Sequence, residues 1–168
     1  IEEAGADALE LNVFFLPADP MVAGAEIERQ YLSVVRDVAE KVSVPVAVKI
    51  STHFTSPLNM IQGIRQCGAE GVVMFNRFYE PDINTDSVQV MEADIFSTSA
   101  DLRGSIRWIA MASAAFPDLD IAASTGVHTG ADAVKVLLAG ASAFEVCSAI
   151  YHNGLGVIDR INGYLSGW

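Results

Sequence analysis

Short runs of Val, Ile and Ala alternate along the chain with longer segments in which apolar residues recur every three to four positions. The short runs are apolar on both faces, which is typical of parallel strands buried between other layers. The longer segments have the period of amphipathic helices. We therefore predict five strands, at residues 8–12, 46–50, 71–75, 120–124 and 143–146.

Helices are predicted in the segments that follow these strands. The clearest covers residues 25–41, where Ile27, Tyr31 and Val35 share one apolar face. The remaining helices are predicted at residues 58–66, 101–115, 131–138 and 155–165. The connection 76–100 is the longest loop and contains a candidate hairpin at residues 83–91. Loops of such length usually have a function.

Successive βα units close into a (β/α)8 barrel or form an open doubly wound sheet. No GxGxxG motif follows the first strand, which argues against a dinucleotide-binding sheet. A whole barrel needs about 200 residues or more, and this chain opens on Ile1 rather than on Met. We therefore expect an α/β fold: the C-terminal five βα units of a TIM (β/α)8 barrel, with residues 1–168 as a single partial barrel domain and the N-terminal strands absent from this chain.

Composition narrows the class of partner. The 168 residues include 10 basic and 21 acidic side chains, a formal net charge of −11. This balance argues against nucleic acid and against anionic membrane surfaces, because both attract clustered Lys and Arg. No run approaches the roughly 18 apolar residues of a membrane helix. Cys67 and Cys147 lack the spacing of a metal site or a disulfide framework. We expect a cytoplasmic protein that acts on a small molecule.

Polar residues at the carboxyl ends of the predicted strands are the first candidates for ligand binding, because ligands of parallel α/β folds bind there. Asn12, Lys49 and Asn76 stand at the ends of three successive strands. A lysine within an apolar strand is rarely buried without a partner, so Lys49 predicts an anionic or electron-rich ligand. The alternative is an ion pair with Glu10 or Glu145 inside the barrel.

Small residues follow the last two predicted strands. Backbone N–H groups at this position of a barrel, and at a helix start, form the usual phosphate site. The candidates are Thr125, Gly126, Cys147 and Ser148. Plain turns between strand and helix are the alternative. His53, His128 and His152 lack ligand spacing, so we predict no metal site and expect these histidines on the surface or in loops.

Five sequence blocks carry a family resemblance. They are residues 6–12 (ADALELN), 45–50 (PVAVKI), 68–79 (GAEGVVMFNRFY), 129–133 (TGADA) and 138–143 (LAGASA). In this order and spacing they resemble the dihydroorotate dehydrogenase family, and more closely its dihydroorotate dehydrogenase-like branch. The resemblance runs through nearly the whole chain. It implies a barrel that binds flavin mononucleotide (FMN) and oxidises a small ring.

The resemblance also implies roles for the candidate residues. Lys49 matches the lysine that contacts the isoalloxazine ring, and Asn12 and Asn76 match asparagines around the flavin and the pyrimidine. The positions that hold the FMN phosphate in the family fall on four residues: Thr125, Gly126, Cys147 and Ser148. The cofactor's identity comes from the resemblance alone.

The chain departs from the family at the residue that abstracts a proton. Phe15 stands where the family has Cys or Ser, and a phenyl ring cannot accept a proton. Asp19 and Glu80 are the nearest acids that could replace it. Thr125 and Cys147 also replace glycines of the family's phosphate-binding segments. We therefore expect poor oxidation of dihydroorotate itself.

Three functions remain open. The first is an FMN-dependent dihydroorotate dehydrogenase-like oxidoreductase acting on a dihydropyrimidine or similar small ring, in the context of pyrimidine biosynthesis. The second is a non-redox phosphate-binding barrel, and the third is a vestigial flavin-binding module without turnover. Flavin absorbance separates the first from the second, and turnover with dihydroorotate separates the first from the third. A homodimer is compatible with the sequence, and the electron acceptor is left open.

Overall fold

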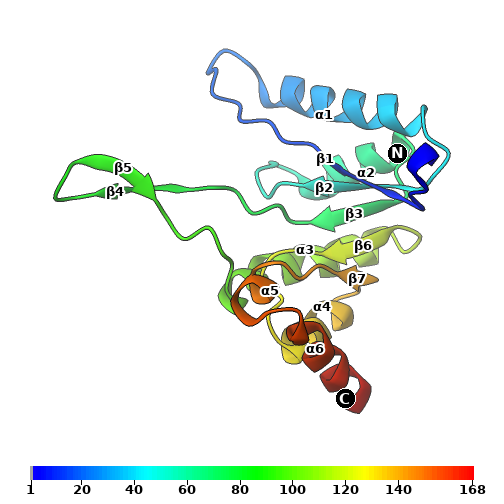
Figure 1. Ribbon diagram of the computed structural model, residues 1–168. Coiled ribbons are helices and arrows are strands. Elements are labelled where there is room, and N and C mark those ends of the chain that lie inside the picture. Colours follow the sequence, from blue (N-terminus) through cyan, green and yellow to red (C-terminus); the bar gives the residue numbers. More distant parts are fainter. Residues whose placement is uncertain (1) are drawn as a thin grey trace.

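A five-stranded parallel sheet organises the computed structural model, which describes residues 2–168 (Figure 1). Its strands are β1 (Leu9–Asn12), β2 (Val46–Ile50), β3 (Gly71–Met74), β6 (Asp120–Ala123) and β7 (Ala143–Phe144). They lie side by side in chain order. The strand order of a doubly wound sheet reverses at one point. The unreversed order is consistent with one arc of a barrel.

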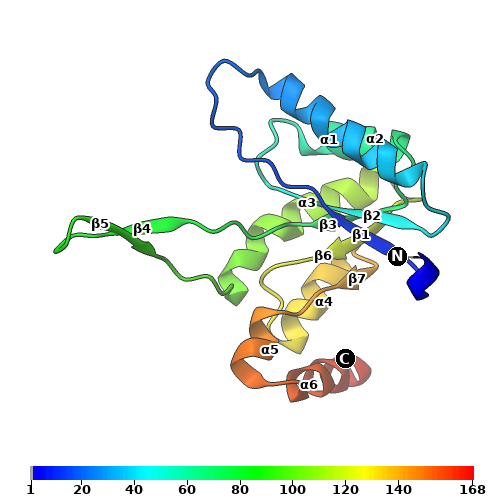
Figure 2. The same cartoon turned by 45° about the horizontal axis from the view of Figure 1, so that its top comes forward.

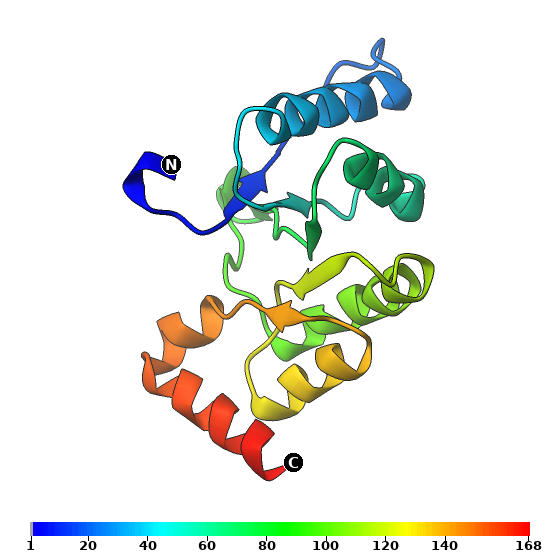
Figure 3. The same cartoon turned by 90° about the vertical axis from the view of Figure 1, so that its right-hand side faces the viewer.

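Among the described residues, four helices pack along one face of this sheet: α1 (Gly24–Ala39), α2 (Pro57–Gln66), α3 (Leu102–Ala115) and α4 (Gly130–Leu138). Successive helices of this series contact one another, and Figure 3 shows them on the same side of the strands. α5 (Ser148–Asn153) and α6 (Gly156–Gly167) follow β7, and α6 packs on α4. The 3-10 turns η1 (Glu2–Ala4) and η2 (Ser99–Asp101) precede β1 and α3.

Side-chain alternation gives the sheet two different faces. In β2, Val48 and Ile50 are fully buried in the core beneath the helices, whereas Lys49 between them faces away from those helices. The parallel register places Asn12 beside Lys49 and Lys49 beside Val73. One row of residues thus crosses the sheet on the face opposite the helices. This row positions the candidate site.

An antiparallel hairpin interrupts the βα rhythm between β3 and α3. It consists of β4 (Pro81–Asn84) and β5 (Gln89–Glu92), and we call residues 81–92 the arm. The arm projects from the body of the molecule in both views (Figures 1 and 2). Ile83 and Val90 pair across it and are 63% and 73% exposed. The arm therefore contributes nothing to the core and stands beside the carboxyl end of the sheet.

The sequence prediction agrees with most of these elements. The predicted strand 46–50 coincides with β2, and the predicted helices match α1 to α4 and α6 to within two residues at each end. The strand predicted at 143–146 ends earlier, at Phe144, because the chain leaves the sheet there. The short helix α5 was not predicted, since six residues are too few to show an amphipathic period. Within residues 2–168, none of the helices has the length and hydrophobicity of a membrane span.

Candidate functional site

Two adjoining cavities lie at the carboxyl end of the sheet and share Asn76, Arg77 and Thr125. The first, which we call the rim cavity, has a volume of about 250 Å³. Its lining includes Lys49, Asn76, Ser97, Gly126, Glu145, Cys147 and Ser148. The second, which we call the arm cavity, has a volume of about 650 Å³ and lies between the arm, β3 and the start of α3. The candidate residues predicted from the sequence are concentrated around the rim cavity.

Lys49 is held by two carboxylates. Its Nζ donates a hydrogen bond to Glu145 and another, of 3.3 Å, to Oε1 of Glu10. Burial lowers the pKa of Lys49, but the two carboxylates outweigh burial and raise that pKa above its ordinary value. Lys49 is therefore a charged ammonium at the rim cavity. The ion pair that the sequence left as an alternative is present, with Glu145 as well as Glu10.

Glu10 and Glu145 respond to this shared lysine in opposite directions. Burial, then the hydrogen bond and charge of Glu145, raise the pKa of Glu10. Burial also acts to raise the pKa of Glu145, but hydrogen bonds from Glu10, Lys49 and Ser124 outweigh it, and the pKa of Glu145 is lowered. Glu10 therefore takes up a proton before Glu145 as the pH falls. Among the described residues, Lys49 is the only lysine that lines the rim cavity, and Glu145 is the carboxylate beside it.

Two asparagines span the end of β2. Nδ2 of Asn76 donates to Oδ1 of Asn12 over 2.6 Å. The backbone N–H of Asn76 donates to the carbonyl of Ile50 over 2.9 Å, which fixes the chain where it leaves β3. The structure thus brings together the three residues that the sequence placed at one rim, and Lys49 and Asn76 line the same cavity. Their roles toward a ligand remain predictions.

The candidate phosphate-binding segments converge on Ser97. Its Oγ accepts a hydrogen bond from the Gly126 amide over 3.3 Å, and its own amide donates to Oγ of Ser148 over 3.0 Å. Nε2 of His128 lies 3.1 Å from Oγ of Ser97. Ser97 is not among the candidates from the sequence, because it lies in a loop without periodicity. His128 lies in the loop between β6 and α4, as expected, and is half-buried there.

Thr125 occupies a backbone conformation that favours glycine. Its φ is 71°, and that of Gly126 is 92°. A β-branched residue is strained in this left-handed region. The hydroxyl of Thr125 donates to the carbonyl of Phe75 over 3.0 Å, which ties the turn to the end of β3. This hydrogen bond helps to hold Thr125 in the strained conformation.

Cys147 precedes α5 and lines the rim cavity as an exposed free thiol. It is half of the Cys147–Ser148 pair that the sequence assigned to phosphate. Within residues 2–168, no group of His, Cys, Asp and Glu side chains is arranged to hold a metal ion. Groups of the lining that can donate to an anion include the ammonium of Lys49 and the hydroxyl of Ser148.

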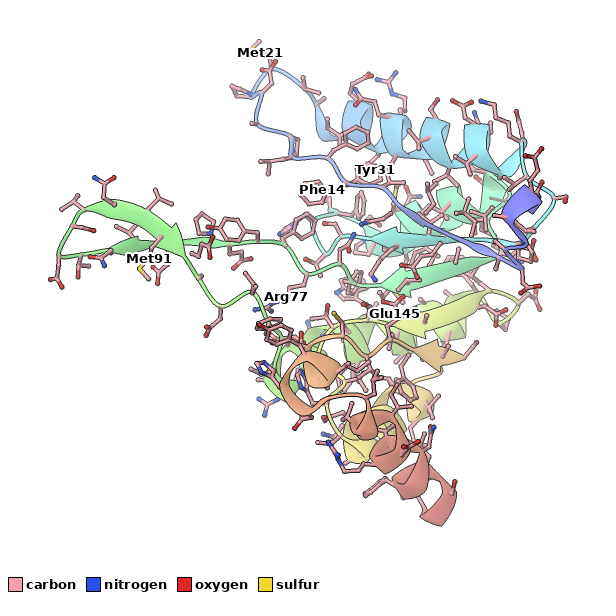
Figure 4. The ribbon with its side chains drawn as sticks, viewed as in Figure 1. Phe14, Met21, Tyr31, Arg77, Met91 and Glu145 are labelled. Carbon is pink, nitrogen blue, oxygen red and sulfur yellow. The ribbon has the colours of Figure 1, made fainter. Side chains whose placement is uncertain are left out.

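The arm cavity is strongly acidic. Its lining contains five carboxylates: Glu80, Asp82, Glu92, Asp94 and Asp101. Arg77 lies at the mouth shared with the rim cavity and is held by carbonyl and carboxylate oxygens (Figure 4). Burial raises the pKa of Asp101, but the Thr98 amide and the charge of Arg77 outweigh it and lower that pKa below its ordinary value. Asp101 is thus a firmly ionised partner of Arg77.

Phe15, the residue at the expected base position, lies outside both of these cavities. Its amide donates to the hydroxyl of Tyr31 over 3.1 Å, and the two rings meet edge to face at 4.9 Å. It lines a third cavity of about 330 Å³ against α1, together with Asp19. The neighbouring Phe14 packs instead on Phe78, with ring centroids 4.6 Å apart. Figure 4 shows Phe14 and Tyr31 below α1.

The two acids considered as replacement bases are separated by this arrangement. Asp19 accepts a hydrogen bond from the Met21 amide over 2.9 Å and faces the third cavity. Glu80 lines the arm cavity, as do Asn76 and His53. His53 is held at Nδ1 by the hydroxyl of Ser51, 3.1 Å away. Of the two acids, only Glu80 shares a cavity with Asn76.

Comparison with known proteins connects this site to a family. The sequence model of the family described as dihydroorotate dehydrogenase matches residues 3–167. The catalytic subunit of dihydroorotate dehydrogenase B (NAD(+)) from Thermoplasma volcanium is 26% identical over 98% of this chain and 55% of its own length. The same subunit from Pyrococcus abyssi is 28% identical over 93% of this chain and 53% of its own length.

A solved structure supports the fold. The crystal structure of DHODH in complex with ferulenol from Eimeria tenella superposes with a TM-score of 0.70 at 20% identity, covering 95% of this chain and 49% of that one. The chain therefore spans about half the length of the relatives it matches. The α/β fold with a parallel sheet, corresponding to about half of such a chain, is consistent with the predicted partial TIM barrel.

Proposed function

The chain belongs to the dihydroorotate dehydrogenase family, and we propose that it forms part of an FMN-dependent oxidoreductase acting on a dihydropyrimidine or similar small ring. The observation that carries this proposal is the rim cavity, which combines Lys49, Asn76, Gly126 and Ser148 on neighbouring strand ends. The chain covers about half of its relatives, so the proposal concerns the activity of the whole protein.

The residues of the rim cavity fit the two ends of FMN. The hydroxyl of Ser148 provides a neutral donor for a phosphate, next to the Gly126 amide that Ser97 holds in place. The ammonium of Lys49 provides a charged donor for the electron-rich ring. When bound, FMN supplies an acceptor for a hydride. The protein's part is to bind and orient both rings.

Lys49 and the two asparagines would position those rings. The ammonium of Lys49 is directed by Glu145, so its position is fixed before a ligand binds. The hydrogen bond between Asn76 and Asn12 orients the amide of Asn76, which lines the cavity. Amides present donors and acceptors in one plane, which suits a flat heterocycle. These contacts support the assignments that the resemblance implied.

Phe15 provides no base for the removal of a proton from the substrate. A positioned base contributes about 10² to 10⁴ in rate, and Phe15 packs on Tyr31 with no acceptor to offer. We therefore expect slow reduction of the bound flavin by dihydroorotate. Stopped-flow bleaching of the flavin measures this rate. Reduction as fast as in relatives with a Cys or Ser base would contradict the assignment of Phe15.

Flavin binding tests the proposal directly. FMN titrated into the whole protein that contains this chain should be bound with a change in flavin absorbance and quenched fluorescence. Lys49→Met should weaken binding about tenfold or more, because it removes a charged hydrogen bond worth roughly 1.5–3 kcal/mol. Lys41→Met, at the end of α1 and far from the cavity, is the matched control. Binding of inorganic phosphate without any binding of flavin would favour the non-redox barrel instead.

Binding without reduction by any dihydropyrimidine would favour the vestigial module. The cytoplasmic setting also remains part of the proposal, and the free thiols of Cys67 and Cys147 are compatible with a reducing compartment.

A further inference from the structure

We infer that the ring accepted at this site carries no carboxylate, so that the substrate class is an uncharged dihydropyrimidine. The inference rests on the proposed function and on the arm cavity as the substrate's place. That cavity adjoins the rim cavity through Asn76, Arg77 and Thr125, and is the larger of the two. A ring stacked beside a flavin in the rim cavity would therefore extend into it.

The charge of the arm cavity opposes an anionic substrate. Five carboxylates line it: Glu80, Asp82, Glu92, Asp94 and Asp101. Among the described residues of its lining, Arg77 and His53 are the only basic side chains. Like charges repel, and the repulsion is stronger inside a cleft than in open solvent. A carboxylate entering the arm cavity would meet a negative potential.

The guanidinium of Arg77 already has partners, so it does not neutralise a substrate carboxylate. Its Nε donates to the carbonyl of Ile95 over 3.1 Å, and its Nη2 donates to the carbonyl of Asp94 over 3.0 Å. Its Nη1 lies 3.3 Å from Oδ1 of Asp101. Proteins usually recognise a carboxylate by two parallel donors of one guanidinium. Here that fork is used to hold the return segment of the arm against the start of α3.

The other side chains that line the arm cavity are suited to a neutral flat ring. Asn76 contributes an amide, and an amide complements the alternating carbonyl and N–H groups of a pyrimidine. Phe78 forms an aromatic wall, with the ring of His53 packed against it at 4.8 Å between centroids. Packing against an aromatic side chain stabilises a bound flat ring whether or not that ring is charged. Only the charge of the substituent is selected against.

Two nearly isosteric probes separate charge from shape. Uracil-6-carboxylate and uracil-6-carboxamide differ in one charge, and their affinities for the FMN-loaded whole protein can be measured by isothermal titration calorimetry. We expect the carboxamide to bind about tenfold more tightly at low salt. The gap should narrow in about 0.5 M salt, where the screening length falls to a few ångströms. Equal binding, or tighter binding of the carboxylate, at low salt would overturn the inference.

Variants that replace a carboxylate by an amide test whether the arm cavity discriminates between the two probes. Glu80→Gln combined with Glu92→Gln should narrow the gap between the two probes, because both side chains line the arm cavity. Glu40→Gln combined with Asp159→Asn removes the same charge from α1 and α6 and should leave the gap unchanged. Equal narrowing in both double variants would overturn the assignment to the arm cavity. If FMN binds and neither probe does, the inference fails alone; if FMN does not bind, the proposed function fails with it.

Discussion

The same strands form both faces of the five-stranded sheet, but the two faces differ in burial and in the polarity of their side chains. On the helix-covered face, Val48, Ile50 and Met74 are completely buried. On the opposite face, one strand position away, Lys49 and Glu145 form an ion pair that retains 17% and 32% side-chain exposure. Burial of apolar area stabilises the first face, whereas the second contributes polar groups at the strand ends. The apolar core lies on one face of the sheet and the candidate site on the other.

The largest effect expected from this difference is on stability. Ile50→Ala should lower the free energy of unfolding by about 2–5 kcal/mol, because it leaves a cavity in the core. Lys49→Met, at the adjacent position on the other face, should cost at most about 1 kcal/mol, because ion pairs in contact with solvent contribute little. Urea unfolding of both variants measures the contrast. A comparable loss in both would show that the two faces do not differ as described.

Two glycines near the start of α3 sharpen the comparison further. A Cβ on Gly126 would lie 2.7 Å from the amide nitrogen of Leu102, and φ there is 92°. Gly126→Ala should therefore cost about 1–3 kcal/mol in strain and weaken FMN binding. Gly104, within α3, has open space around its Cβ position, so Gly104→Ala should stabilise the chain by about 0.5–1 kcal/mol. Thermal unfolding and a flavin titration on both variants check this prediction.

Asp132 is the one buried carboxylate among the described residues. This 2% exposed carboxylate accepts hydrogen bonds from Ser99 and from the amide and hydroxyl of Thr129, and thereby links η2 to α4. Burial acts to raise the pKa of Asp132, but Ser99, Lys135 and Thr129 outweigh it and lower the pKa below its ordinary value of 3.8. The ionised carboxylate is therefore stabilising.

Asp132→Asn should cost about 1–3 kcal/mol at neutral pH, because the partners of a buried carboxylate lose a charged acceptor. The folded-state pKa of Asp132 is lowered, so its contribution is fully present above 3.8 and is lost as the pH falls through the lowered value. The penalty of the variant should therefore shrink in acid. Urea unfolding at neutral pH and below the ordinary value measures it, and a penalty that stays constant would contradict the assigned charge.

The two faces also explain how much the sequence could reveal. The strands and long helices were predicted closely because Val48 and Ile50 repeat with the period of a buried strand, and Tyr31 and Val35 with that of a helix. Such periods depend only on local spacing. Asn12, Lys49 and Asn76 could be placed at one rim for a related reason, since parallel strands bring their ends together.

Contacts between distant loops could not be predicted in the same way. Ser97, His128 and Ser148 meet only because the long connection returns from the arm to the sheet. No period or motif marks Ser97 as a partner of either residue. The ring of Phe15 likewise points to Tyr31, because an amide-to-hydroxyl hydrogen bond fixes that loop. Sequence spacing cannot show which way an irregular loop turns.

The smallest expected effect concerns the partners of Lys49. Its folded-state pKa is raised, so the ion pair stabilises the chain fully below the ordinary value of 10.5, and that contribution is lost as the pH rises through the raised value. Glu145→Gln should lower the pKa of Lys49 more than Glu10→Gln does, because Glu145 makes the shorter contact and is the less exposed partner. Either variant should change the free energy of unfolding by at most about 1 kcal/mol at neutral pH. NMR titration of the Lys49 side chain in alkaline solution gives the order of the two effects. If Glu10→Gln had the larger effect, Glu145 would not be the main counter-ion, and the polar face would be organised from β1 rather than from the rim cavity.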